Sequence, residues 1–284
     1  MREADKAGSR GSRATVRGIG RAVGAALVGL GVAAVVAGCA HGPTAKENLA
    51  TAYKEFDSPN PNYAQVADAA DAYLKEQPTG PAAADALYLR GRALEAKGQA
   101  DTTSPQKDFV DAYNYYEQAL GQKPRPGLAA LIHIGMANVL YFQGRYSAAI
   151  NEFNLGLPQA ERDDTRAWAL YRIGVCEQRM GQWEDADRQF VAVQQQFPNT
   201  PQAQQAREKQ GARAFYVQVG SYAGTQQADA AAAELKKQGY PAQRFVDTAR
   251  NVQLVRVGPM PTYEAAAATK QKIWGKYRDA IVVP

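Results

Sequence analysis

The sequence has few of the side chains that most enzyme active sites require. It contains two histidines, His41 and His133, and two cysteines, Cys39 and Cys176, among 284 residues. Two cysteines can form one disulfide but no disulfide framework, and neither residue type recurs at a metal-binding spacing. No acid–histidine–nucleophile arrangement is evident. We therefore expect a protein that is not an enzyme and that needs no cofactor or metal.

Positive charge is scarce in the middle of the chain. Residues 39–212 hold 17 Lys and Arg against 21 Asp and Glu, whereas residues 213–284 hold ten against five. A helical array that binds nucleic acid needs a basic stripe, so the acidic middle argues against nucleic acid as the main partner. The basic C-terminal region favours an anionic partner instead.

The first 38 residues have the pattern of an export signal. Basic residues precede an uncharged run at residues 22–36, which is long enough for a signal sequence but too rich in Gly and Ala to make a good membrane span. The run ends in Val36-Ala37-Gly38-Cys39, which resembles the lipobox of bacterial lipoproteins. This resemblance implies cleavage before Cys39 and its modification with fatty acyl chains such as palmitate. A single transmembrane anchor is the alternative.

The residue after Cys39 bears on location. Ala40 stands where an aspartate would resemble the inner-membrane retention signal of some bacteria. An alanine at this position favours the periplasmic face of the outer membrane over the inner membrane or the surface of a cell with one membrane.

Residues 46–210 repeat a helical pattern. Gly144 and Gly181 are 37 residues apart, and each precedes an Ala-x3-Phe sequence by five residues. Gly98 lies 46 residues before Gly144, and removal of a nine-residue insertion within "GQADTTSPQKD" restores the same period. The pattern resembles the tetratricopeptide repeat, which implies a solenoid of antiparallel helix pairs that binds a protein partner. We expect a degenerate first repeat over residues 46–78 and a surface loop at the insertion.

The pattern changes at residue 214 from helical to alternating. We predict strands at residues 215–219, 242–246, 252–257 and 280–283, and helices at residues 225–238 and 263–274. This β-α-β-β-α-β order is that of a ferredoxin-like domain, with helices on one face of the sheet and the other face open. The whole chain is thus expected to be a helical solenoid followed by a small ferredoxin-like domain.

Alternation along the strands predicts which side chains lie on the open face. In the first strand, Val217 and Val219 point inward, so Tyr216 and Gln218 point outward. In the third strand, Val255 and Val257 point inward. The outward residues of that strand are Val252, Leu254 and Arg256.

Three segments of this region resemble the SPOR domain (sporulation-related repeat). They are "FYVQVGSY" at 215–222, "KKQGYPAQ" at 236–243 and "LVRVGPM" at 254–260. The resemblance implies binding to peptidoglycan, in particular to glycan strands stripped of their stem peptides at the division septum. It also implies that the contacts lie on the open face and on the turn after the first strand. The predicted glycan-binding residues are Tyr216, Gln218, Ser221, Tyr222, Val252, Leu254 and Arg256.

Two details refine this prediction. A stripped strand carries a free lactyl carboxylate, which Arg256, or Arg244 if it faces outward, would bind through two parallel hydrogen bonds. Many SPOR domains carry an aromatic residue near positions 252 and 253 for sugar stacking, and this sequence has none there. Tyr216 or Tyr222 would substitute for it.

Together these patterns predict four segments. They are a cleaved signal peptide at residues 1–38, a linker at 39–45, tetratricopeptide-like repeats at 46–210 and a SPOR domain at 212–284. We expect a lipid-anchored envelope protein that binds peptidoglycan and recruits a protein partner, in cell division or wall remodelling. The alternative is a protein scaffold, or an outer-membrane assembly or tethering factor, whose SPOR fold does not bind glycan.

Overall fold

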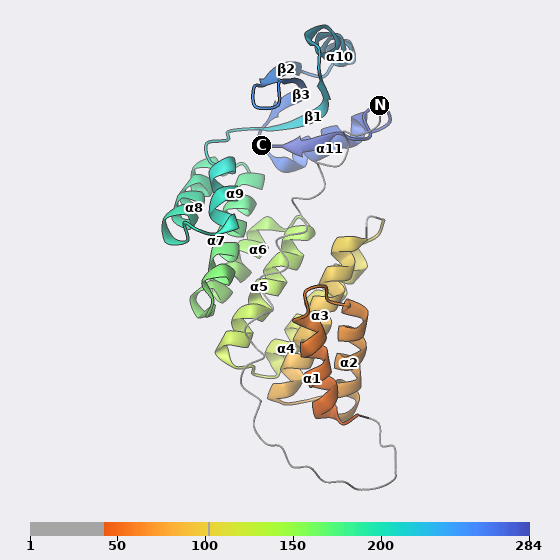
Figure 1. The fold of residues 1–284 in the computed structure, drawn as a ribbon, viewed down its shortest axis with the longest axis vertical. Helices are drawn as coiled ribbons and strands as arrows, with labels where there is room; N and C mark the ends of the chain where they lie inside the picture. The colour runs from red at the N-terminus through yellow and green to blue at the C-terminus, as the bar shows by residue number, and fades with distance from the viewer. Residues whose placement is uncertain (1–42, 102) are drawn as a thin grey trace. The chain divides into compact units, whose positions relative to one another are not determined.

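The computed structural model describes residues 43–284 except Thr102, so the predicted signal peptide and Cys39 lie outside the described residues. The described chain has nine α-helices followed by a mixed α/β domain (Figure 1). It divides into two compact units between Ala169 and Leu170. The helices are α1 (Ala45–Phe56), α2 (Tyr63–Glu76), α3 (Pro81–Ala100), α4 (Gln106–Gly121), α5 (Pro126–Phe142), α6 (Tyr146–Gly156), α7 (Asp163–Arg179), α8 (Trp183–Gln196) and α9 (Pro201–Lys209).

Local sequence signals explain where several helices begin and end. Thr44 caps α1 in a reciprocal hydrogen-bonded arrangement with Glu47, and Pro81 opens α3, where its missing N–H costs nothing. Gly144 and Gly181 follow α5 and α7 with φ of 77° and 80°, a conformation that glycine adopts without strain. These two glycines, which lie 37 residues apart, are therefore helix terminators.

The insertion before α4 differs in part from the prediction. Helix α3 continues through Gly98 to Ala100, and only residues 101–105 separate it from α4. Gly98 is buried, and a Cβ atom there would lie 2.8 Å from the ring of Phe109 on α4. The predicted loop is shorter than expected because close packing of the two helices keeps its flanks helical.

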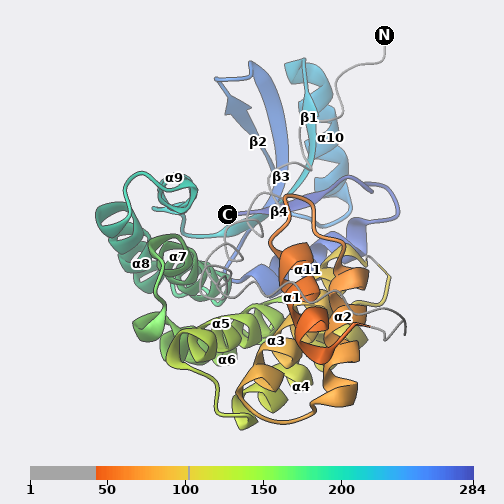
Figure 2. The same ribbon diagram turned by 60° about the horizontal axis from the view of Figure 1, so that its bottom comes forward.

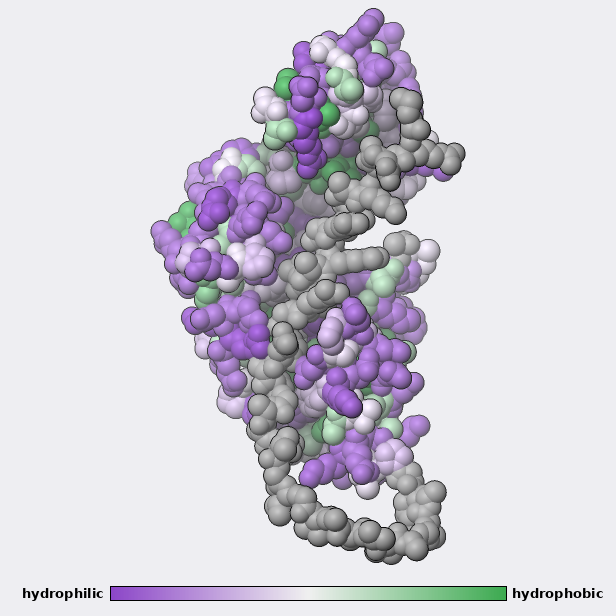
Figure 3. Space-filling view, viewed as in Figure 1, coloured by the Kyte–Doolittle hydropathy of each residue, from purple (hydrophilic) through white to green (hydrophobic). Residues whose placement is uncertain are grey.

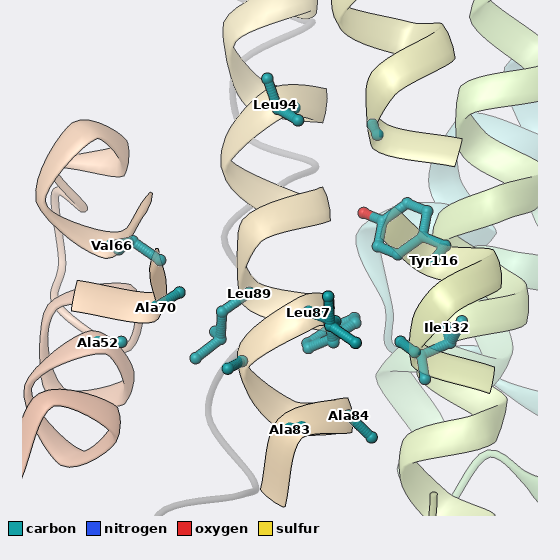
Figure 4. Packing of buried hydrophobic residues seen from close by; sticks show 14 of the residues in the cluster. Ala52, Val66, Ala70, Ala83, Ala84, Leu87, Leu89, Leu94, Tyr116 and Ile132 are labelled. Carbon is teal, nitrogen blue, oxygen red and sulfur yellow. The ribbon is translucent and has the colours of Figure 1, made fainter. Parts of the chain in front are cut away.

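The core of the first unit lies between α3 and the helices on either side of it. Figure 4 shows Leu89 of α3 directed toward Val66 and Ala70 of α2, and Leu87 directed toward the opposite side, where Tyr116 lies. All five side chains are buried. The many alanines let the helix backbones approach closely, so burial of a few large residues holds each helix pair to the next.

A buried polar cluster links three helices within this core. The carboxylate of Glu95 on α3 is 1% exposed, and it accepts a hydrogen bond of 2.7 Å from the Tyr116 hydroxyl on α4. It also accepts a hydrogen bond from the amide of Asn138 on α5 and forms an ion pair with Arg92 at 3.3 Å. Because a buried charge is costly unless it is paired, this cluster favours one arrangement of α3, α4 and α5.

The second unit contains the mixed domain. Its elements are β1 (Phe215–Tyr222), α10 (Thr225–Lys237), β2 (Ala242–Asp247), β3 (Val252–Met260), α11 (Tyr263–Ile273) and β4 (Ile281–Val283). The strands form one antiparallel sheet in the order β2-β3-β1-β4, and α10 and α11 pack against it (Figure 2). The predicted helical region and ferredoxin-like element order are confirmed.

The end of α7 and the start of α8 belong to the same compact unit as the sheet. The ring of Trp183 lies 5.0 Å from that of Phe215, and it packs against the core beneath the sheet. The guanidinium of Arg179 lies 3.9 Å from the centre of the Tyr263 ring. A Cβ atom on Gly181 would lie 2.7 Å from the carbonyl oxygen of Pro261. The last helices of the repeat region thus contribute side chains to the packing of the mixed domain.

Candidate functional site

One face of the sheet is covered by helices, and the other carries the predicted site residues. Phe215, Val217 and Val219 of β1 are buried in a core shared with α10 and α11. Tyr216 and Gln218, which alternate with them, are only half-buried. The strand therefore directs its apolar residues toward the helices and its polar residues to the open face, as alternation predicts.

A β-bulge changes this alternation near the end of β1. The pairing with β3 shifts between Gln218 and Gly220, so that Val219 is an additional residue in β1. Beyond the bulge, Ser221 lies opposite Leu254, and Tyr222 lies opposite Gln253. Ser221 thereby stays on the open face, where strict alternation from Val219 would have turned it inward.

Tyr222 is therefore separated from the other predicted site residues. Its side chain packs against the core on the helix-covered side of the sheet. Burial raises the pKa of its hydroxyl, and the nearby phenol of Tyr277 adds to this effect. The structure thus provides no place for the Tyr222 ring on the open face.

Arg256 lies at the centre of the open face. It is opposite Gln218 of β1 and opposite Gln243 of β2. Its Nε donates a hydrogen bond of 3.3 Å to Oε1 of Gln218, and its guanidinium carbon lies 5.1 Å from the centre of the Phe245 ring. The side chain is thus held by an amide on one side and an aromatic ring on the other, and this orients its terminal N–H groups.

Two aromatic rings lie beside this arginine. Phe245 of β2 and Tyr216 of β1 are 5.5 Å apart between ring centres, at an interplanar angle of 72°. Gly258 of β3 leaves room for the tyrosine, because a Cβ atom there would lie 2.8 Å from Cδ1 of Tyr216. The open face thus has an apolar aromatic surface next to a guanidinium group.

Phe245 is not among the glycan-binding residues predicted from the sequence. Alternation in "AQRFVD" around the inward residue Ala242 places Gln243 and Phe245 outward, so the signal was present. The pairing of Phe245 with Leu254 shows where its ring lies on the sheet. Phe245 therefore places an aromatic ring on the open face, on the strand next to β3.

Some of the remaining predicted residues lie on the open face, and Arg244 lies on the opposite face. Leu254 is 8% exposed and lies between Ser221 and Phe245, so it mainly supports its neighbours. Val252 is half-buried at the start of β3, opposite Asp247. Arg244 lies on the helix-covered side, where it forms an ion pair of 2.8 Å with Asp229 of α10. Arg244 therefore does not face outward.

The helical repeats show a different surface. In Figure 3 the visible part of the helices is mainly hydrophilic, and its apolar residues lie in small separate groups. A partner that binds this face would meet mainly polar groups. Among residues 43–284 without Thr102, no helix is long and apolar enough to cross a membrane. Within the same residues, no group of His, Cys, Asp or Glu has the geometry of a metal site.

Comparison with known protein families agrees with both regions. The family model of the SPOR domain matches residues 211–284, and that of the tetratricopeptide repeat matches residues 106–172. No curated protein matches the chain. Residues 211–284 are therefore a SPOR domain, and the helical region before it contains repeats of the tetratricopeptide type.

Proposed function

We propose that this protein binds peptidoglycan glycan strands through the open face of its SPOR sheet. SPOR domains are a peptidoglycan-binding family, and tetratricopeptide repeats mediate protein interactions, which supports a binding role in the cell envelope. The observation that carries the proposal is Arg256, held between Gln218 and the Phe245 ring on a sheet face that no helix of the domain covers.

The chemistry of this face fits a glycan strand that has lost its stem peptides. The Phe245 and Tyr216 rings offer an apolar surface for the faces of sugar rings. Gln218 and Ser221 offer amide and hydroxyl groups for the N-acetyl and hydroxyl groups of the sugars. Removal of a stem peptide leaves a lactyl carboxylate, which the terminal nitrogens of Arg256 would bind through two parallel hydrogen bonds. An intact stem peptide has no free carboxylate at that position.

The proposal places the chain in the envelope by a lipid on Cys39, at the periplasmic face of the outer membrane. The lipobox-like sequence that ends at Cys39 supports this placement. The repeats would then recruit a protein partner to sites rich in stripped strands, such as the division septum. Labelling of growing cells with an alkyne fatty acid tests the anchor. The label should appear in the wild-type chain and be absent from Cys39→Ala.

Co-sedimentation with purified sacculi tests the glycan proposal. Residues 43–284 are the suitable protein, because Trp183 contributes to the core beneath the sheet and would be lost from a shorter fragment. Pelleting should increase when the sacculi are first treated with an amidase. Phe245→Ala and Arg256→Ala should reduce it, and Arg256→Lys should not restore it, since one ammonium cannot form the paired hydrogen bonds.

Arg250→Ala is the matched control for charge. Arg250 is an exposed arginine in the turn between β2 and β3 of the same domain. Its removal should leave pelleting nearly unchanged. If the protein fails to pellet with either type of sacculus, the domain has the SPOR fold without the ligand, and the chain is a scaffold or tethering protein.

A further inference from the structure

The C-terminal end of α11 carries an unusual combination of exposed side chains. Trp274 is 48% exposed, although the other two tryptophans of the chain, Trp168 and Trp183, are buried or packed against a core. Because part of this large apolar side chain stays in water, folding does not gain the full free energy of removing it from water. An exposed tryptophan of this kind is therefore a candidate contact for a partner.

Several positively charged residues lie close to this tryptophan in the chain. Four cations lie within four residues of Trp274 in the chain: Lys270, Lys272, Lys276 and Arg278. The ammonium group of Lys270 lies 5.3 Å from the centre of the Trp274 ring. Lys276 forms an exposed ion pair of 3.4 Å with Glu234 of α10, so its charge is partly balanced. Residues 270–278 contain no acidic residue, and Asp279 follows directly after them. We refer to Lys270, Lys272, Trp274, Lys276 and Arg278 as the α11 patch.

The α11 patch is separate from the open face of the sheet. Ile273, the neighbour of Trp274, is buried with Ala266 in the core between α11 and the sheet. The patch therefore belongs to the helix-covered side of the domain, and the residues proposed to bind glycan belong to the opposite side. A ligand bound to one side of the domain therefore leaves the other side free to bind a second ligand.

We propose that the α11 patch binds the surface of an anionic phospholipid bilayer. Indole rings favour the boundary between hydrocarbon and headgroups, where one part of the ring is apolar and its N–H meets water. Lysine and arginine side chains next to such a ring reach lipid phosphates while their alkyl stems stay near the apolar layer. One ring and four cations give a free protein weak but measurable binding to such a bilayer. The patch acts as a second contact for a chain that is already held near a membrane, where the effective concentration is high.

This inference goes beyond the proposed function, because neither Trp274 nor its cations lie on the glycan-binding face. It gives the domain two opposite binding sides, one for the wall and one for a membrane. A domain of this kind would hold the glycan-binding sheet turned away from the membrane and toward the wall.

Vesicle binding tests this inference directly. Residues 43–284 would be mixed with vesicles of phosphatidylcholine alone or with added phosphatidylglycerol, and the bound fraction would be measured by flotation. We expect binding only to the anionic vesicles, weakened by added salt. We also expect a blue shift of the tryptophan emission that disappears in Trp274→Ala.

Single substitutions provide the quantitative part of the test. Lys270→Gln and Lys272→Gln should each lower the apparent affinity for anionic vesicles roughly fivefold, the effect of one cation at a charged membrane surface. Lys46→Gln is the matched control, because Lys46 is an exposed lysine on α1. It should leave the affinity unchanged.

Three results would overturn the inference. They are no binding to anionic vesicles, binding that Trp274→Ala and both lysine variants leave unchanged, and a loss of sacculus pelleting rather than vesicle binding in these variants. The last result would make the patch a second glycan contact. Phe245→Ala separates this test from that of the proposed function, since it should lose sacculus pelleting and keep vesicle binding.

Discussion

The helical repeats and the sheet domain each contain a cluster of polar side chains, but only one of the two is buried. In the repeats, Glu95 is 1% exposed, and its carboxylate accepts hydrogen bonds from side chains on two neighbouring helices. In the sheet domain, Arg256 donates a hydrogen bond to Gln218 on a face that no helix covers. Both clusters combine a charge, an amide and an aromatic residue. The buried cluster is not accessible to a ligand, and its hydrogen bonds instead stabilise one arrangement of α3, α4 and α5. The exposed cluster is available to a ligand. Burial, more than residue type, therefore separates a structural polar cluster from a recognition surface.

The largest effect is expected when the buried cluster is broken. Glu95→Ala removes the partner of Arg92, a residue that is 4% exposed, and leaves its buried guanidinium group without a carboxylate. Loss of one partner of a buried ion pair costs about 3–5 kcal/mol of unfolding free energy. Guanidinium denaturation followed by circular dichroism measures it. Glu117→Ala, at an exposed position on α4, is the control and should change stability by less than about 0.5 kcal/mol.

A smaller loss is expected where two helices meet around Tyr116. A Cβ atom on Gly91 would lie 2.6 Å from Cε1 of the Tyr116 ring, so Gly91→Ala overfills the contact between α3 and α4. Such overpacking costs about 1–3 kcal/mol. In Gly121→Ala, the added methyl group meets open space at the end of α4, so stability should stay the same or rise slightly. Equal effects of the two substitutions in thermal denaturation would contradict the close contact between Gly91 and the Tyr116 ring.

The exposed cluster should respond in binding rather than in stability. Phe245→Ala removes the ring that Arg256 and Tyr216 contact, and the affinity for amidase-treated sacculi should fall about tenfold, as for one aromatic anchor of an interface. The midpoint of urea denaturation should change little, since Phe245 is only half-buried. A large loss of stability with unchanged pelleting would instead assign the residue to the core.

The smallest effect concerns a half-buried acid on α7. Burial raises the pKa of Glu177 from 4.5 to about 7, and the negative charge of Asp185 adds to this. Between these two values the folded chain binds more protons than the unfolded chain, so stability should fall as pH rises from 4.5 to 7. Solvent around the half-exposed side chain keeps the change modest. Glu177→Gln should remove this part of the pH dependence when denaturation midpoints are compared across that range.

The sequence predicted the architecture well because periodic signals are local. The helical repeats follow from a 37-residue period, and the order of strands and helices after residue 214 follows from a change of period. Alternation also identified Gln218 and Arg256 as outward residues, and the structure places them opposite each other. These features depend on residues close in the chain, which the sequence displays directly.

The composition of the site depended on contacts between distant residues. The bulge at Val219 directs Ser221 outward and Tyr222 inward, and no local pattern announces it. The position of Phe245 beside Arg256 follows from the register of β2 on β3, and Asp229 of α10 holds Arg244 on the helix side. The sequence by itself determined which segments form the sheet. Only the tertiary structure decided which side chains share its open face, because register and helix packing join residues that lie far apart in the chain.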